Sequence, residues 1–227
     1  MPSMSIGAGS SQRGATLSLL GTLALFILIC LPQQASAGRS LSVPISTAAI
    51  PDQIQRIPLF VMKWDESAEP DPLTLRWGRS QVPVRGAGMA CIPVAFQFAL
   101  SRVAPQIRPT GTLSLYVTVP GPMRAEGFEA GVALAIGFLA ILKGDRLLQD
   151  VAVTGTLLPD GQIGPVTHVA EKARAAAHAG YRLLLVPRGQ FYAPRANLVR
   201  SGPESKLLVY EVGTIEEAYE IMTGKKL

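Results

Sequence analysis

Cysteine and histidine are scarce in this chain, which has two of each among its 227 residues. Cys30 lies in an apolar N-terminal segment that we expect to be removed, which leaves Cys91 as the single cysteine of the mature chain. One thiol excludes an internal disulfide and a zinc site built from cysteines. The two histidines show no ligand spacing, so the sequence predicts no metal site, and no motif indicates a cofactor.

Aromatic side chains and clusters of charge are also few. Aromatic residues make up 6% of the chain and charged residues 16%, and the net charge is +5. The lysines and arginines are scattered, whereas a nucleic-acid groove needs them along one face together with stacking aromatics. We therefore expect no binding to nucleic acid.

Hydrophobic residues, in contrast, make up 48% of the chain, which is ample for a folded core. Residues 1–37 are typical of an export signal: Arg13 precedes an uncharged apolar run at 15–31, and small residues at 35–37 form a cleavage site. The alternative is a retained membrane anchor, although the run is slightly shorter than the ~20 residues that span a bilayer. Both alternatives place the domain outside the cytoplasm, either periplasmic or secreted, or tethered to the membrane through this segment alone.

The first half of the folded part is predicted from apolar periodicity. Small, polar residues at 38–56 predict a flexible leader, so the domain is expected to cover 57–227. Two apolar runs separated by an acidic, proline-rich turn predict an N-terminal hairpin. A helix, an alternating strand and a helix that is apolar on nearly every face follow. The hairpin strands are expected at 57–63 and 73–77, the helices at 89–103 and 129–142, and the alternating strand at 113–119.

In the second half, strands and helices alternate, which predicts a single α/β (α+β) domain. An alanine-rich helix is expected at 169–179, with Gly180 as its left-handed cap. Thr214 is expected to cap a final helix. The strands are expected at 150–155, 163–166, 183–186 and 207–211.

One stretch carries a specific family resemblance. Residues 150–166 read DVAVTGTLLPDGQIGPV, and an alanine-rich helix containing Lys172 and the segment GYRLLLVP at 180–187 follow. This stretch closely resembles the proteolytic domain of Lon-type serine proteases, a fold shared with the second domain of ribosomal protein S5. The sequence of this stretch is most similar to that of stand-alone, exported Lon-like proteins without an ATPase. The chain shows no Gly-x-x-x-x-Gly-Lys-Ser/Thr phosphate loop.

The resemblance implies a serine and lysine dyad, in which an unprotonated lysine takes the proton of the attacking serine. Lys172 falls on the lysine position, and Thr154 falls on the threonine that hydrogen-bonds this lysine. Glu129 stands where the family has its serine. Phe128, just before it, replaces a small residue or proline, and Thr167 with His168 replaces a glycine pair near the lysine.

Two interpretations of Glu129 follow from its chemistry. A carboxylate beside Lys172 favours the protonated ammonium, the opposite of what a general base requires, so the two side chains are expected to form a buried ion pair. The alternative is a hydrolase with relocated chemistry at Glu129, His168 and Lys172, because His168 precedes Lys172 by one helical turn.

The sequence therefore predicts a catalytically inactive Lon-like domain that binds a peptide or protein partner. The first alternative is an active, ATP-independent peptidase that uses the relocated residues. The second is a structural subunit that assembles with an active homologue. The sequence leaves open whether the chain forms a homo-oligomer.

Overall fold

The structure is a computed structural model that describes residues 38–44, 59–68, 72–77, 90–118, 129–191, 198–200 and 206–227. All of them belong to one compact unit, Ser36–Leu227. In chain order the elements are β1 Arg39–Pro44, β2 Leu59–Asp65, β3 Thr74–Trp77, α2 Cys91–Val103, β4 Thr112–Thr118, α3 Gly131–Lys143, β5 Val151–Val153, β6 Thr156–Leu157, β7 Ile163–Gly164, α4 Val169–His178, β8 Leu183–Pro187, β9 Leu198–Arg200, β10 Lys206–Val212 and α5 Ile215–Thr223.

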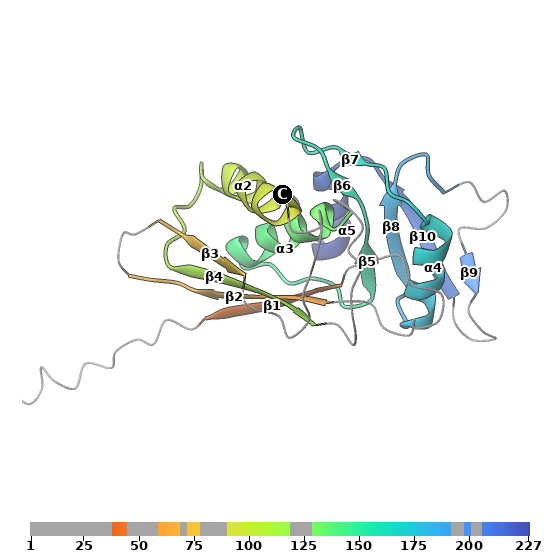
Figure 1. Ribbon diagram of the computed structural model, residues 1–227, viewed down its shortest axis with the longest axis horizontal. Coiled ribbons are helices and arrows are strands. Elements are labelled where there is room, and N and C mark those ends of the chain that lie inside the picture. The colour runs from red at the N-terminus through yellow and green to blue at the C-terminus, as the bar shows by residue number, and fades with distance from the viewer. Residues whose placement is uncertain are drawn as a thin grey trace, which may run out of the picture. The chain divides into compact units, whose positions relative to one another are not determined.

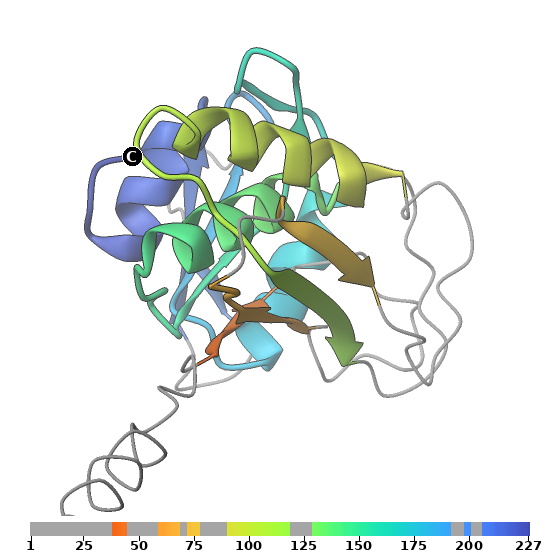
Figure 2. The same cartoon turned by 90° about the vertical axis from the view of Figure 1, so that its left-hand side faces the viewer.

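The N-terminal sheet has the strand order β1-β2-β4-β3, with β3 parallel to β4 and the other pairs antiparallel. Helices α2 and α3 lie side by side across one face of this sheet (Figures 1 and 2). Alternate residues of the strands point toward the helices, so Met62, Leu113 and Leu115 are buried. Phe96 of α2 and Phe138 of α3 meet edge to face, with ring centroids 5.4 Å apart.

Helix α3 is the centre of the main hydrophobic core. Every residue from 131 to 142 is buried, which confirms the prediction of a helix that is apolar on nearly all faces. Gly137 allows the helix to approach the sheet closely: a Cβ atom there would lie 2.6 Å from Val43 Cγ2 and 2.7 Å from Met62 Cε. The helix ends at Gly144, whose left-handed backbone (φ +75°) terminates it.

The second sheet has the order β5-β8-β10-β9, with parallel pairs between β5, β8 and β10 and an antiparallel edge strand β9. Helix α4 covers one face through small side chains, which gives a second core cluster of Ala152, Ala173, Ala176, Ala177, Leu184, Val186, Leu207 and Val209. Gly180, with φ +84°, follows α4 as predicted, and the Tyr181 amide donates to the Ala176 carbonyl in a Schellman pattern.

The sheets and the four helices found among the described residues confirm the predicted α/β class. Two details of the prediction are wrong. Strands β2 and β3 do not pair as a hairpin, because β4 lies between them and bonds to both. Residues 39–44 are not part of a flexible leader, because they form β1, pair with β2 and bury Val43.

The proposed export or anchor segment, residues 1–37, lies outside the described residues, as does most of the proposed leader. Among the helices that the structure describes, none has the length and apolar content needed to cross a membrane.

Candidate functional site

Glu129 and Lys172 come from two different helix starts. Glu129 lies two residues before α3, and Lys172 lies in α4. The end of β5 positions Glu129: the Gly155 amide donates to the Glu129 carbonyl (3.1 Å), and the Val132 amide donates to the Gly155 carbonyl (3.2 Å). Gly131 lies so close to this segment that its Cβ would be 3.1 Å from the Leu157 amide nitrogen. These backbone contacts place the Glu129 side chain opposite α4.

The Glu129 carboxylate is bound on both oxygens. Lys172 Nζ lies 2.7 Å from Oε2, while the Thr167 amide (2.6 Å) and the Thr167 hydroxyl (2.8 Å) donate to Oε1. Lys172 Nζ also donates to the Thr167 carbonyl at 2.6 Å. We call these three donors, the Thr167 amide, the Thr167 hydroxyl and Lys172 Nζ, the Thr167–Lys172 clamp. The sequence-predicted partners are thus in direct contact.

The two charges differ in their access to solvent. The Lys172 side chain is 0% exposed and the Glu129 side chain 17% exposed, so the carboxylate lies on the outer side of the pair. Burial of Glu129 acts to raise its pKa, but the hydrogen bonds from Lys172 and Thr167 outweigh burial and lower the pKa below its usual value. Glu129 is therefore an ionised, hydrogen-bonded carboxylate at neutral pH.

Thr154 lies next to this site without joining it. Its side chain is fully buried, and its hydroxyl oxygen has no hydrogen-bond partner among the described residues. The hydrogen bond to Lys172 that the resemblance implies is therefore not formed, because the lysine ammonium is directed to Glu129 and to the Thr167 carbonyl instead.

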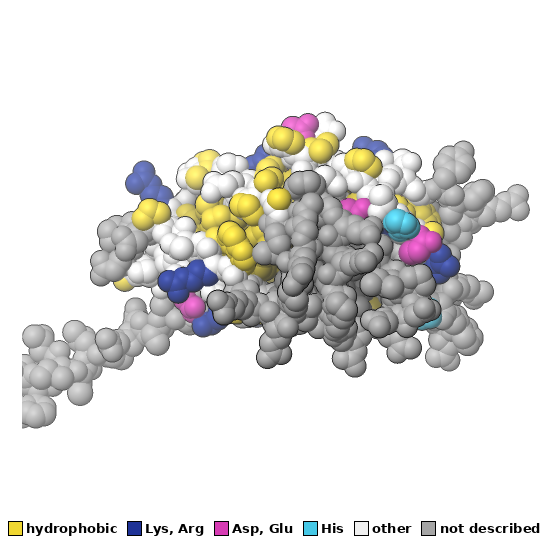
Figure 3. Space-filling view, in the orientation of Figure 1, with side chains coloured by type: hydrophobic (Ala, Val, Ile, Leu, Met, Phe, Trp, Pro, Cys, Tyr) yellow, Lys and Arg dark blue, Asp and Glu magenta, His cyan; other side chains and the backbone are white. Residues whose placement is uncertain are grey.

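His168 is at the N-cap of α4 and not within the helix. Its backbone is left-handed, with φ +54° and ψ +44°, and its side chain is exposed. The expectation that His168 and Lys172 share a helix face is wrong, because the helix begins only at Val169. The surface over α4 shows exposed histidine, acidic and basic side chains (Figure 3). Phe128, the remaining predicted site residue, lies outside the described residues.

In the part of the chain that the structure describes, no group of three or more His, Cys, Asp or Glu side chains is arranged to hold a metal ion.

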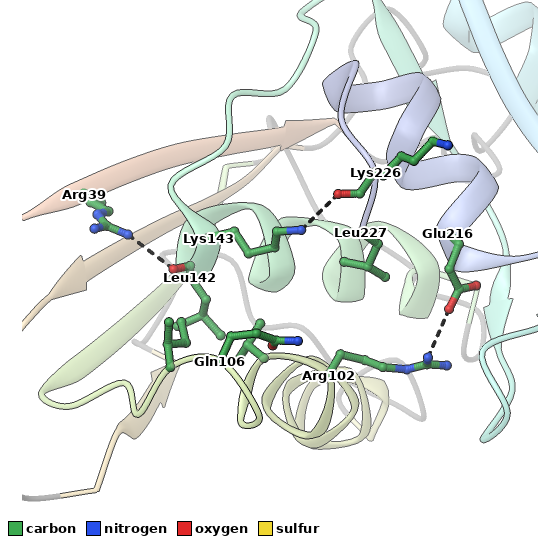
Figure 4. A pocket seen from close by; sticks show the side chains of 10 residues that line it. Arg39, Arg102, Gln106, Leu142, Lys143, Glu216, Lys226 and Leu227 are labelled. Carbon is green, nitrogen blue, oxygen red and sulfur yellow. Dashed lines mark hydrogen bonds and ion pairs between the residues drawn. The ribbon is translucent and has the colours of Figure 1, made fainter.

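A separate cavity of about 670 Å³ lies at the ends of α2, α3 and α5 (Figure 4). Two basic residues that line it bind other parts of the fold. Arg39 donates to the Ile141 and Leu142 carbonyls at the end of α3, and Arg102 pairs with Glu216 at 3.2 Å. Cations at helix C-termini offset the negative end of the helix dipole. Neither Glu129 nor Lys172 lines this cavity, and two of its charged side chains, Arg39 and Arg102, have partners within the fold.

Comparison with known proteins identifies the family of this domain. The family profile of the Lon protease (S16) C-terminal proteolytic domain matches residues 103–218. The chain belongs to this family. Similar proteins are Lon protease 1 of Herpetosiphon aurantiacus (39% identical over 75 residues, 33% of this chain and 9% of that protein), Lon protease 1 of Thermus thermophilus (29% over 109 residues, 48% and 13%) and the archaeal Lon protease of Archaeoglobus fulgidus (31% over 103 residues, 44% and 16%). The matched regions thus cover only 9 to 16% of the length of these relatives.

Within this Lon-type domain, two residues of the site escaped the sequence argument. The family resemblance marks Thr167 only as a replacement for glycine, yet this residue supplies two of the three donors to Glu129. Gln190 accepts from the Val166 amide and donates to the Val166 carbonyl, both at 2.8 Å, and so holds the chain just before Thr167. The threonine directly before a helix cap was a usable signal for the first. No local pattern indicates the second, because the two partners are 24 positions apart.

Proposed function

We propose that this chain is a non-hydrolytic Lon-type domain that binds a peptide or protein partner outside the cytoplasm. The observation that supports the absence of hydrolysis is the hydrogen bonding of the Glu129 carboxylate. The atom at the nucleophile position is a carboxylate oxygen already hydrogen-bonded to the lysine that would have to remove a proton. A serine and lysine dyad requires a hydroxyl nucleophile whose proton the lysine can take. This pair supplies no hydroxyl, and Lys172 Nζ is bound to the Glu129 carboxylate at 2.7 Å.

The rival hydrolase with chemistry at Glu129, His168 and Lys172 has less support. His168 is exposed at the N-cap, and among the described residues its side chain has no hydrogen bond or ion pair to Glu129 or Lys172. A general base must be within hydrogen-bond reach of the group it deprotonates.

Hydrolysis is tested with the purified chain on unfolded casein and on small peptide esters. We expect no turnover above that of the Glu129→Ala variant. Robust hydrolysis by the unmodified chain that is lost in Glu129→Ala would contradict the proposal. Loss in His168→Ala at an unchanged melting temperature would identify the relocated chemistry.

Export and partner binding rest on the sequence. The apolar run at 15–31 and the small residues at 35–37 support export, and the retained family fold with an occupied dyad position supports a binding role. Fractionation of cells that produce the full chain, followed by N-terminal sequencing, tests both location and cleavage. Fluorescence anisotropy with labelled unfolded casein tests binding, and the mass of the chain in solution tests assembly into oligomers.

A further inference from the structure

The Thr167–Lys172 clamp has the composition of a carboxylate receptor. It presents an amide, a hydroxyl and an ammonium to one carboxylate at 2.6 to 2.8 Å. Charge-assisted hydrogen bonds of this length are about twice as strong as neutral ones. One of the donors, Lys172, is 0% exposed, whereas Thr167, which supplies the other two, lies at the surface, so the clamp combines a buried ammonium with donors that solvent can reach.

Glu129 occupies this clamp as a ligand that belongs to the chain itself. Its side chain reaches the clamp from the segment before α3 and is the more solvent-accessible partner of the ion pair, 17% against 0% exposed. A carboxylate from another molecule that took its place would satisfy the same three donors and leave no buried lysine unpaired. Exchange therefore avoids the penalty for an unpaired buried charge that outright removal of Glu129 would incur.

We propose that the Thr167–Lys172 clamp is a binding site for the carboxylate of a partner, and that Glu129 is the internal ligand with which this carboxylate exchanges. The proposal rests on the binding role proposed above and names the chemical group that the site recognises. The carboxylate comes either from a peptide C-terminus or from an acidic side chain, and the same three donors bind both.

Replacement of Glu129 by alanine gives a direct test, because it removes a group with the size and charge of acetate. The melting temperature of the full-length Glu129→Ala chain is measured with increasing sodium acetate and with sodium chloride at equal ionic strength. We expect acetate to raise it in a saturable manner, as a ligand that binds only the folded state does. The unmodified chain and Glu129→Gln, whose side chains fill the clamp, should not respond to acetate beyond the effect of salt.

The matched control is the double variant Glu129→Ala with Lys172→Met. Replacing both members of a buried ion pair with uncharged residues is often neutral for stability, so this chain is expected to fold. It should lose the acetate response. A folded Glu129→Ala chain without a saturable response, or an equal response in the double variant, would overturn the proposal.

A second measurement does not depend on the stability of Glu129→Ala. Labelled Ala- and Gly-based peptides are titrated into the unmodified chain and into Thr167→Val, which lacks the hydroxyl donor. Three peptides distinguish the sources: one with a free C-terminus, its C-terminal amide, and the amide with one internal glutamate. We expect binding only by peptides with a carboxylate, and weaker binding to Thr167→Val. Equal binding of the plain amide would refute carboxylate recognition.

The same peptides separate the clamp from a simple acidic surface at Glu129. An internal ligand competes at an effective concentration of about millimolar or more. Folded Glu129→Ala should therefore bind a carboxylate peptide about tenfold or more tightly than the unmodified chain. If Glu129 instead contacted the partner directly, the variant would bind more weakly, and the proposal would fail. Peptide hydrolysis by the unmodified chain would contradict the non-hydrolytic assignment without affecting the acetate result.

Discussion

At the scale of single residues, Glu129 converts the electrostatics of the Lon dyad position. A serine there would leave Lys172 beside a neutral hydroxyl, whereas the glutamate gives it a charged partner at 2.7 Å. Buried ion pairs contribute little net stability, yet loss of one partner leaves an uncompensated charge. The pair is consequently sensitive to single substitutions and tolerant of paired ones.

We therefore expect the effects of substituting Glu129 and Lys172 on the free energy of unfolding to be strongly non-additive. Glu129→Ala should lower the free energy of unfolding by about 3 kcal/mol or more, because the fully buried Lys172 loses its counter-charge. The double variant with Lys172→Met should recover most of this loss. Urea unfolding at neutral pH gives the three free energies for a double-mutant cycle. Additive single effects would show that the two charges are not coupled.

The left-handed backbone of His168 leads to a second prediction for a single residue. A non-glycine residue with φ near +54° is strained by about 1 kcal/mol or more, whereas glycine adopts this φ without strain. His168→Gly should therefore raise the melting temperature. The matched control is His178→Gly at the end of α4, where the backbone is helical and glycine should lower it. A decrease in both variants would argue against strain at the N-cap.

At the scale of secondary-structure elements, α5 is the one described helix that begins with a side-chain cap. The Thr214 hydroxyl accepts from the Glu217 amide at 3.2 Å, and the Glu217 carboxylate accepts from the Gly213 amide at 2.9 Å. The first contact satisfies an amide that the helix itself leaves unpaired. The second fixes Gly213, the residue between β10 and the N-cap.

Thr214→Ala should lower the free energy of unfolding by about 1 kcal/mol through loss of this cap. Thr214→Ser keeps the oxygen and should differ little from the unmodified chain. Thermal unfolding of the three proteins, followed by circular dichroism, measures the difference. Equal losses in the two variants would point to the threonine methyl group, and not to the cap, as the source of stability.

At the scale of the whole molecule, two carboxylates link stability to pH. Burial opposes the ionised form of Asp145, but hydrogen bonds from Lys225 (2.6 Å) and Tyr219 (2.5 Å) outweigh it and lower its pKa, as happens at Glu129. Below about pH 4 the unfolded chain takes up protons on these groups more readily than the folded chain. The stabilisation is therefore complete above that pH and is lost as the pH falls through the folded pKa values.

We expect the urea midpoint to be nearly constant from neutral pH to about pH 5 and to fall steeply below about pH 4. Glu129→Gln and Asp145→Asn should each flatten the acid part of this profile. Midpoints measured across the pH range for the three chains test the assignment. An acid limb that is unchanged in both variants would mean that other carboxylates dominate it.

Features that depend on neighbouring residues could be predicted from the sequence, whereas features that depend on distant segments could not. Helix α3, the cap at Thr214 and Gly180 after α4 follow from local periodicity and turn chemistry, and the structure has all three. Strand partners depend on distant segments, so β4 between β2 and β3 was missed. Strand β1 was missed because its short polar residues resemble a leader, although Val43 contacts the core.

The sequence by itself determined which helices form, which family the chain resembles and which residue stands at the nucleophile position, because these follow from residue type and spacing along the chain. Only the tertiary structure decided how Glu129 is held. Thr167, 38 positions away, supplies two hydrogen bonds. The Thr154 hydroxyl finds no partner within the described part of the chain, and the His168 side chain is exposed. Hydrogen bonds of a few ångströms between distant segments depend on how the sheets and helices pack, and no local pattern records that packing.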